Sequence, residues 1–125
     1  MATWQEVKNY IHANLKADDI DDSTIQLVWD LGNNRSQLVS VTSQLNGEAV
    51  VVFSPIGHID KIDLKKLLMM TNDTLFSVAC IGDIVGMQQL LNTATLDEAE
   101  LAIALNPMAE VADVFERELT GGDQF

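Results

Sequence analysis

Three neighbouring segments in the first half of the chain alternate between apolar and polar residues. The first places apolar side chains at every second position, at Ile25, Leu27, Trp29 and Leu31. The second covers residues 37–45 with the same period, which is that of a strand with one buried face. Between them lies Gly32-Asn33-Asn34, which is typical of a turn. Because so short a connection joins antiparallel strands, the sequence predicts an antiparallel pair.

A third strand is predicted at residues 48–54. It follows Asn46-Gly47, a strong hairpin signal, because both residues tolerate the positive φ of a type I′ turn. The residues from 49 to 53 are all apolar, which predicts a central strand. The three strands together form an antiparallel meander. Pro55-Ile56-Gly57-His58 then predicts a break in the sheet.

A helix is expected before the meander, over residues 3–16. Thr3 and Glu6 have the spacing of a capping box. The residues Trp4, Val7, Ile11 and Leu15 follow at intervals of three and four, which places them on one helical face. Residues 17–23, with four acids in the five positions from 18 to 22, are predicted to form a loop.

The second half predicts a helix, two strands and a closing helix. The helix is capped by Asp60 or Asp63 and runs out near Asn72. Strands are expected at residues 75–81 and 84–91, joined by a tight turn at Gly82-Asp83. The last helix opens with a second capping-box spacing over residues 95–98.

An apolar stripe runs along the last helix, at Leu101, Leu105, Met108, Ala112, Phe115 and Leu119. The stripe keeps its phase across Pro107, which favours one kinked helix over two separate helices. Whether Pro107 kinks or breaks the helix stays open. Thr120-Gly121-Gly122 has the composition expected at a helix end.

Length and composition fit one α+β domain over residues 1–125. The chain has 125 residues, 47% of them hydrophobic, which is enough to bury a core without disulfides or metals. The predicted order is helix, three-stranded antiparallel meander, helix, two strands and C-terminal helix. No repeat or linker interrupts it.

The charge balance argues against several classes of function. The chain holds 19 acidic and 7 basic residues, for a net charge of −12. Nucleic acids and anionic membrane surfaces bind through Lys and Arg, so neither is an expected partner. No apolar run approaches the about 20 residues of a membrane span. One cysteine and no signal-like segment favour a reducing cytoplasmic setting, and Cys80, between Ala79 and Ile81, is expected to pack in the interior.

Four residues follow the spacing of a calcium-binding loop: Asp19, Asp21, Ser23 and Asp30. That motif requires Gly at its sixth position, where this chain has Thr24, and Glu at its twelfth. We therefore expect an acidic, solvated loop there and predict no metal site.

No catalytic set emerges from the remaining reactive residues. His12 and His58 lack ligand spacing to another His or Cys. His58 and Asp60 could act as a base and its orienting acid, but no nucleophile accompanies them. Gly82 and Gly86 bracket a turn without a basic residue to meet a phosphate. We predict no catalytic residue, no cofactor and no enzymatic activity.

Acidic residues are concentrated towards the C-terminus. From Asp97 to Asp123 there are eight acids and one base, Arg117. One interpretation is a helix with a buried face and a solvated face. The other is an acidic surface that helps to hold a basic or amphipathic partner. The charged residues from 60 to 66 are interpreted as the exposed face of the second helix.

The element order resembles the type III secretion chaperone-like fold, which includes class I chaperones of the Tir-chaperone type and the YbjN group of sensory-transduction regulators. The stretches that carry the resemblance are Ser54-Pro55-Ile56-Gly57, Leu64-Lys65-Lys66-Leu67-Leu68, Leu96-Asp97-Glu98-Ala99-Glu100-Leu101 and Glu116-Arg117-Glu118-Leu119-Thr120-Gly121-Gly122-Asp123. Around the Ser-Pro step, the chain is also similar to the uncharacterised YjfI-like family of bacterial proteins.

The resemblance implies a non-enzymatic, cytoplasmic bacterial protein. Secretion chaperones of this kind are homodimers that hold an extended segment of another protein, so a homodimer with a protein or peptide partner is expected. The strand at residues 49–53 and the helix at 63–71 would lie near the dimer interface, and apolar residues on the sheet would meet the partner. The alternative, implied by the YbjN group, is a regulatory module that binds a small ligand or a signalling protein.

Overall fold

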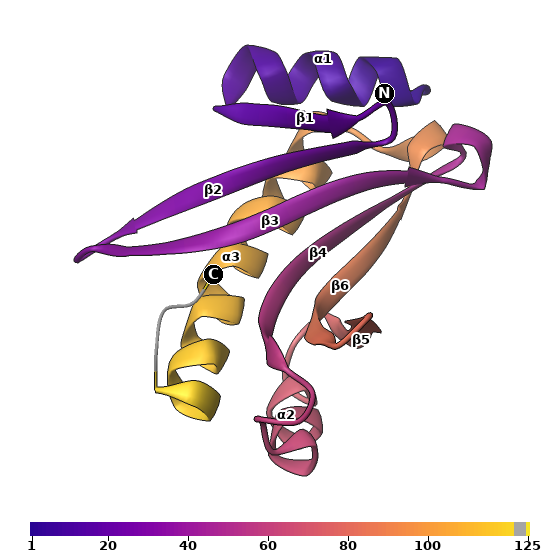
Figure 1. Ribbon diagram of the computed structural model, residues 1–125. Helices are drawn as coiled ribbons and strands as arrows, with labels where there is room; N and C mark the ends of the chain where they lie inside the picture. Colours follow the sequence, from indigo (N-terminus) through magenta and orange to yellow (C-terminus); the bar gives the residue numbers. More distant parts are fainter. Residues whose placement is uncertain (122–124) are drawn as a thin grey trace.

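The alternating segments form one six-stranded antiparallel sheet in the computed structural model, which describes residues 1–121 and 125. Its strand order is β1-β2-β3-β4-β6-β5 (Figure 1). The strands are β1 (Ala17–Asp21), β2 (Thr24–Gly32), β3 (Arg35–Gln44), β4 (Ala49–His58), β5 (Ser77–Ile81) and β6 (Ile84–Asn92). Over the described residues the chain also has three α-helices: α1 (Trp4–Asn14), α2 (Leu64–Thr71) and α3 (Glu98–Thr120).

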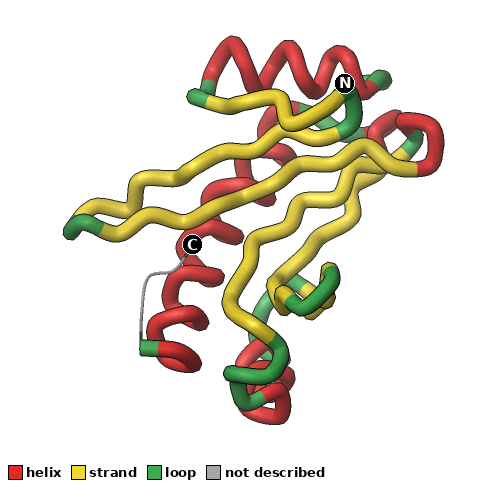
Figure 2. The backbone as a smooth tube through the Cα atoms, viewed as in Figure 1, coloured by secondary structure: helices red, strands yellow, loops and turns green. Residues whose placement is uncertain are grey.

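The predicted meander is confirmed, and its register follows the hydrophobic pattern. Ile25 pairs with Val41 and Leu27 with Val39, so the buried residues of β2 and β3 share a face. β4 lies between β3 and β6, as expected of a strand that is apolar throughout. Figure 2 shows the strands as one continuous, twisted sheet.

The loop predicted at residues 17–23 is wrong, because most of it forms the edge strand β1. Asp18 pairs with Gln26 and Asp19 with Ile25. Only Ala17 is partly buried, while the rest of β1 is exposed. A strand that pairs through its backbone alone shows no hydrophobic period, so the acidic sequence of β1 did not predict a strand.

The break predicted at Pro55 to His58 is also wrong. β4 continues to His58, with a bulge between Pro55 and Gly57. Its ladder with β3 ends at Phe53, so Pro55 lies where β4 is paired with β6 alone. A proline lacks the N–H of a ladder and is tolerated at such a position.

The turn between β3 and β4 is longer than the predicted two-residue hairpin. Gln44 pairs with Ala49, and the short turn η1 (Leu45–Gly47) lies between them. Asn46 and Gly47 have positive φ, as the sequence indicated, but Leu45 also has φ 53°. The strands predicted at 37–45 and 48–54 therefore each lose one residue at this turn.

The helix caps agree with the sequence in part. The Thr3 hydroxyl accepts a hydrogen bond from the Glu6 N–H, and α1 ends at Asn14 rather than 16. Asp63, not Asp60, caps α2. Asp97 caps α3 by accepting from the Glu100 N–H at 2.7 Å, so the predicted cap at position 95 is wrong. Thr95 instead closes the short turn η2 (Thr93–Thr95).

α3 is a single helix that contains Pro107. It ends at Gly121, whose φ of 75° suits a glycine, and whose N–H donates to the Arg117 carbonyl. Gly122 and Asp123, which belong to the sequence-based interpretation of this end, lie outside the described residues.

All three helices pack on one face of the sheet, here called the inner face. Val7 and Ile11 of α1 join the inner side chains of β2, β3 and β4 and the first half of the apolar stripe of α3, up to Met108, in one core cluster. A second cluster joins Leu67 of α2 to Phe115 of α3 and to Val85 of β6. Figure 1 shows α3 running across this face of the sheet.

Candidate functional site

The opposite side of the sheet carries no helix, and we call it the open face. The strand register places on it alternate residues of four neighbouring strands. These are Thr24, Gln26, Val28 and Asp30 of β2, Ser36, Leu38, Ser40 and Thr42 of β3, Val51 and Phe53 of β4, and Gln88 and Leu90 of β6.

Several apolar side chains of the open face are left in solvent. Val28 is 65% exposed and Leu90 is 61% exposed. Leu38 and Val51, on the strands between β2 and β6, are half-buried. Exposed apolar side chains that gather on one surface are typical of a binding site, whereas isolated ones are unremarkable.

Phe53 is the aromatic residue of the open face. The side chain is 8% exposed although no helix covers it. Its ring lies against Gly86, where an added Cβ would stand 2.5 Å from the ring atom Cζ. Gly86, considered above as part of a phosphate loop, therefore serves to seat an aromatic ring.

Most polar side chains of the open face are uncharged, and the charged ones, Asp30 of β2 and Asp18 of β1 opposite Gln26, are acidic. The Thr24 and Thr42 hydroxyls lie 3.4 Å apart, across adjacent strands. Gln26, Ser36, Ser40 and Gln88 are the other uncharged polar residues, and the named residues of this face include no Lys or Arg. Alternating apolar and hydrogen-bonding groups suit a segment of polypeptide, which offers both kinds of contact.

A second exposed apolar surface lies on α2, and we call it the α2 patch. Leu67 is the one buried residue of this helix. Its neighbours Leu68 and Met69 are 58% and 68% exposed, and Leu64 is partly exposed as well. A shallow hollow lined by Lys65, Leu68, Met69 and Asn72 lies on the patch. The helix thus leaves three large apolar side chains, Leu64, Leu68 and Met69, in contact with solvent.

The residues with calcium-loop spacing do not converge. The Asp19 carboxylate pairs with His12 Nε2 at 2.8 Å. Asp21 accepts from the Ser23 N–H, and Asp30 accepts from the Gly32 N–H. No group of His, Cys, Asp or Glu in the described part of the chain could hold a metal ion. The hydrogen bond from His12, aided by its charge, holds the pKa of Asp19 below its usual value.

The other reactive residues also stay apart. His58 ends β4 and Asp60 follows in the next turn, and no hydrogen bond joins their side chains among the described residues. Cys80 is exposed, so the expected interior packing is wrong. Its Sγ donates to the Gly82 carbonyl at 3.2 Å. Cys80 stands near the end of the edge strand β5, and it is not among the residues that pack against either core cluster.

Two acids of α3 are buried, which the sequence did not indicate. Asp113 is 4% exposed, and its carboxylate accepts three hydrogen bonds, at 2.9, 3.1 and 2.7 Å, from the Arg35 guanidinium. Glu116 is fully buried. Asp113 ties α3 to the start of β3, while Glu116 accepts a hydrogen bond from the Phe125 N–H, so neither acid is part of an acidic outer surface. The exposed acids of α3 are Glu98, Glu100, Glu110 and Glu118.

One solved structure shares this fold over nearly its whole length. A chain of "Crystal Structure of the ExsC-ExsE Complex" matches with a TM-score of 0.68, covering 95% of this chain and 97% of that chain at 14% sequence identity. The likeness confirms the predicted α+β, secretion chaperone-like fold. No protein-family model matches the sequence, and no curated protein does. Within the described residues, no helix is long and apolar enough to span a membrane.

Proposed function

We propose that the chain is a non-enzymatic, chaperone-like or adaptor-like module that binds a segment of a protein partner on the open face. The observation that carries the proposal is the exposure of Val28 and Leu90 on a sheet whose helices all pack on the other side. The shared fold with a chain of the ExsC-ExsE complex supports the same role. A cytoplasmic setting, as the composition suggests, belongs to the proposal.

The proposal includes a homodimer formed through the α2 patch. Of the two elements expected near the interface, the strand segment is largely buried within the chain, with Val50 and Val52 fully covered. The α2 patch is not covered, and exposed apolar side chains on a helix are what a second copy would bury. A monomeric protein at tens of micromolar in light scattering would contradict this part.

The decisive experiment compares the open face with a control surface. The protein, its Val28→Lys variant and its Ile103→Lys variant would each be used to capture partners from the native cell. Ile103 is exposed on α3, away from the open face. Proteins that the Ile103→Lys variant captures and the Val28→Lys variant does not would then be purified. Their binding to this protein would be measured by calorimetric titration.

We expect direct binding with a negative heat-capacity change, because apolar surface is buried. We also expect binding at least about tenfold weaker for Val28→Lys, since an interface centre is intolerant of an unpaired charge. Equal binding by both variants would contradict the open face as the site. Capture of a small ligand instead of a protein would favour the regulatory alternative.

A further inference from the structure

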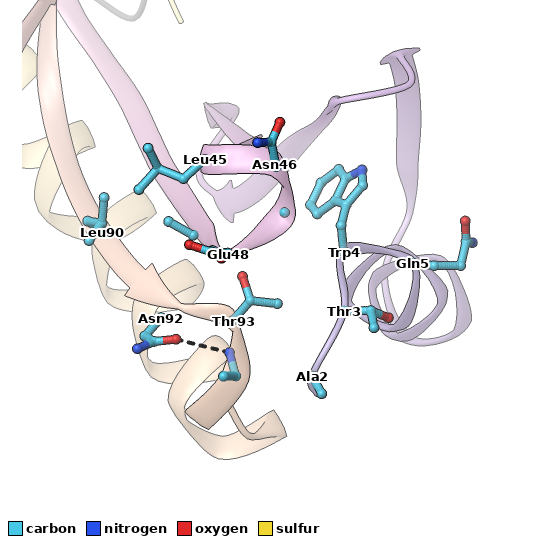
Figure 3. A pocket seen from close by; sticks show the side chains of 13 residues that line it. Ala2, Thr3, Trp4, Gln5, Leu45, Asn46, Glu48, Leu90, Asn92 and Thr93 are labelled. Carbon is cyan, nitrogen blue, oxygen red and sulfur yellow. Dashed lines mark hydrogen bonds between the residues drawn. The ribbon is translucent and has the colours of Figure 1, made fainter.

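A groove of about 760 Å³ opens at the end of the sheet. It lies between the start of α1, the η1 turn and the end of β6 (Figure 3). Leu90 lines this groove and also belongs to the open face. A segment bound across the open face would therefore reach the groove without leaving the surface.

The groove has apolar walls from three separate elements. Trp4 comes from α1, Leu45 from η1 and Leu90 from β6, and Figure 3 shows their side chains around the opening. The Trp4 indole is held in place because its Nε1–H donates to the Asp22 carbonyl at 2.8 Å. Asn92 fixes the far wall by accepting from the Ala94 N–H.

Leu45 is an unusual residue for its position. Its φ of 53° is a conformation that favours Gly or Asn. Its side chain is 66% exposed, so packing in the free chain does not account for a leucine there. An apolar side chain kept at a strained, exposed position points to a contact with another molecule.

The charge of the groove is negative. Glu48 is the one charged residue among those that line it, and its side chain is exposed. Close to the groove, the Met1 ammonium donates to the Leu96 carbonyl, and Glu6 adds a second acid in the first turn of α1. In addition, the Thr93 hydroxyl oxygen is buried without a hydrogen-bond partner.

We infer that this groove takes an arginine side chain, flanked by apolar residues, from the partner segment on the open face. The aliphatic stem would pack on Leu45 and Leu90, and the guanidinium would stack on the Trp4 ring and pair with Glu48. Arginine suits this arrangement better than lysine, because its planar group both stacks and forms two parallel hydrogen bonds with a carboxylate. The inference rests on the proposed protein-binding function and adds the chemistry of the partner.

The test uses a short blocked peptide with one arginine between two leucines, titrated into the labelled protein and followed by NMR. The matched probe replaces arginine with citrulline, which keeps the shape and removes the charge. We expect shifts at the Trp4 indole N–H and at Glu48, and weaker binding of the citrulline peptide by about two- to fivefold. Higher salt should reduce the difference.

Protein variants separate this inference from the proposed function. Glu48→Gln should abolish the preference for arginine, while Glu110→Gln, an exposed acid on α3, should leave it unchanged. Val28→Lys should weaken the natural partner but not the short peptide, because Val28 does not line the groove. Absence of peptide binding, equal binding of both peptides, or shifts confined to other surfaces would overturn the inference, whatever happens at the open face.

Discussion

The two faces of the sheet use the same kinds of residue for different purposes. Along β2, Leu27 on the inner face is 2% exposed, while Val28, the next residue, is 65% exposed. The inner side chain packs against helices, whereas most of the outer one is exposed to solvent. Folding therefore buries one apolar face of β2 and leaves the other exposed. Substitutions at matched positions on the two faces test this difference.

The largest effect is expected from the inner face. Ile25→Ala removes a fully buried side chain from the main core cluster, so we expect the free energy of unfolding to fall by about 3 kcal/mol. Val28→Ala, on the open face, should change it by less than about 0.5 kcal/mol. Urea unfolding of both variants measures the difference. Similar losses at the two positions would mean that something covers the open face in the free protein.

Neighbouring residues of α2 allow the same comparison for assembly. Leu67 is buried within the chain, whereas Leu68 is exposed on the α2 patch. Leu68→Glu should weaken a homodimer by about 2 kcal/mol or more and should leave the fold intact, because an interface core tolerates an unpaired charge poorly. Light scattering and circular dichroism measure the two effects. Lys65→Glu, at the edge of the same hollow, is the control that changes charge without removing an apolar contact.

At the groove we expect a smaller change in the free energy of unfolding, and this change is an increase. Leu45→Asn relieves a left-handed backbone strain, so the free energy of unfolding should rise by about 1 kcal/mol. Binding of the arginine peptide should weaken at the same time, since an apolar wall is lost. Leu90→Asn, in a regular strand, should weaken binding without the gain in stability. A destabilised Leu45→Asn protein would remove the argument that Leu45 is kept for binding.

The smallest effect concerns the exposed pair of His12 and Asp19. The pKa of Asp19 is lowered in the folded state, so its contribution to stability is present above the unfolded pKa and is lost as pH falls through the folded pKa. Carboxyl NMR titration should therefore find Asp19 below the usual Asp range in the wild type. In a His12→Ala variant the value should return towards that range. An unchanged titration would show that the contact does not persist in solution.

The elements that the sequence predicted are those with a hydrophobic period. The spacing of apolar residues alone predicts the inner faces of β2 and β3 and the stripe of α3. The edge strand β1 does not, because its acids are exposed and its pairing uses only the backbone. The break predicted at Pro55 was wrong for a related reason. Proline is compatible with a strand wherever the ladder requires no N–H from that residue.

The candidate site was harder to foresee than the fold. Alternation shows that Val28 points away from Leu27, but which of the two faces the helices cover depends on packing that brings residues 4–14 and 98–120 to the same side. The ion pair of Arg35 with Asp113 joins residues 78 positions apart, so no local pattern reveals it. The groove likewise combines three distant segments, and only its positive-φ turn was visible in the sequence as Asn46-Gly47.

The acids of β1 have a consequence for how copies of this chain meet. A second β1 laid against this edge would bring Asp18, Asp19 and Asp21 of both copies side by side. Like charges at that spacing repel, so the sheet resists growing from copy to copy along this edge. The resistance is electrostatic and short-ranged, and high salt or acid removes it. Concentrated samples of this protein should therefore store best at low ionic strength and neutral pH.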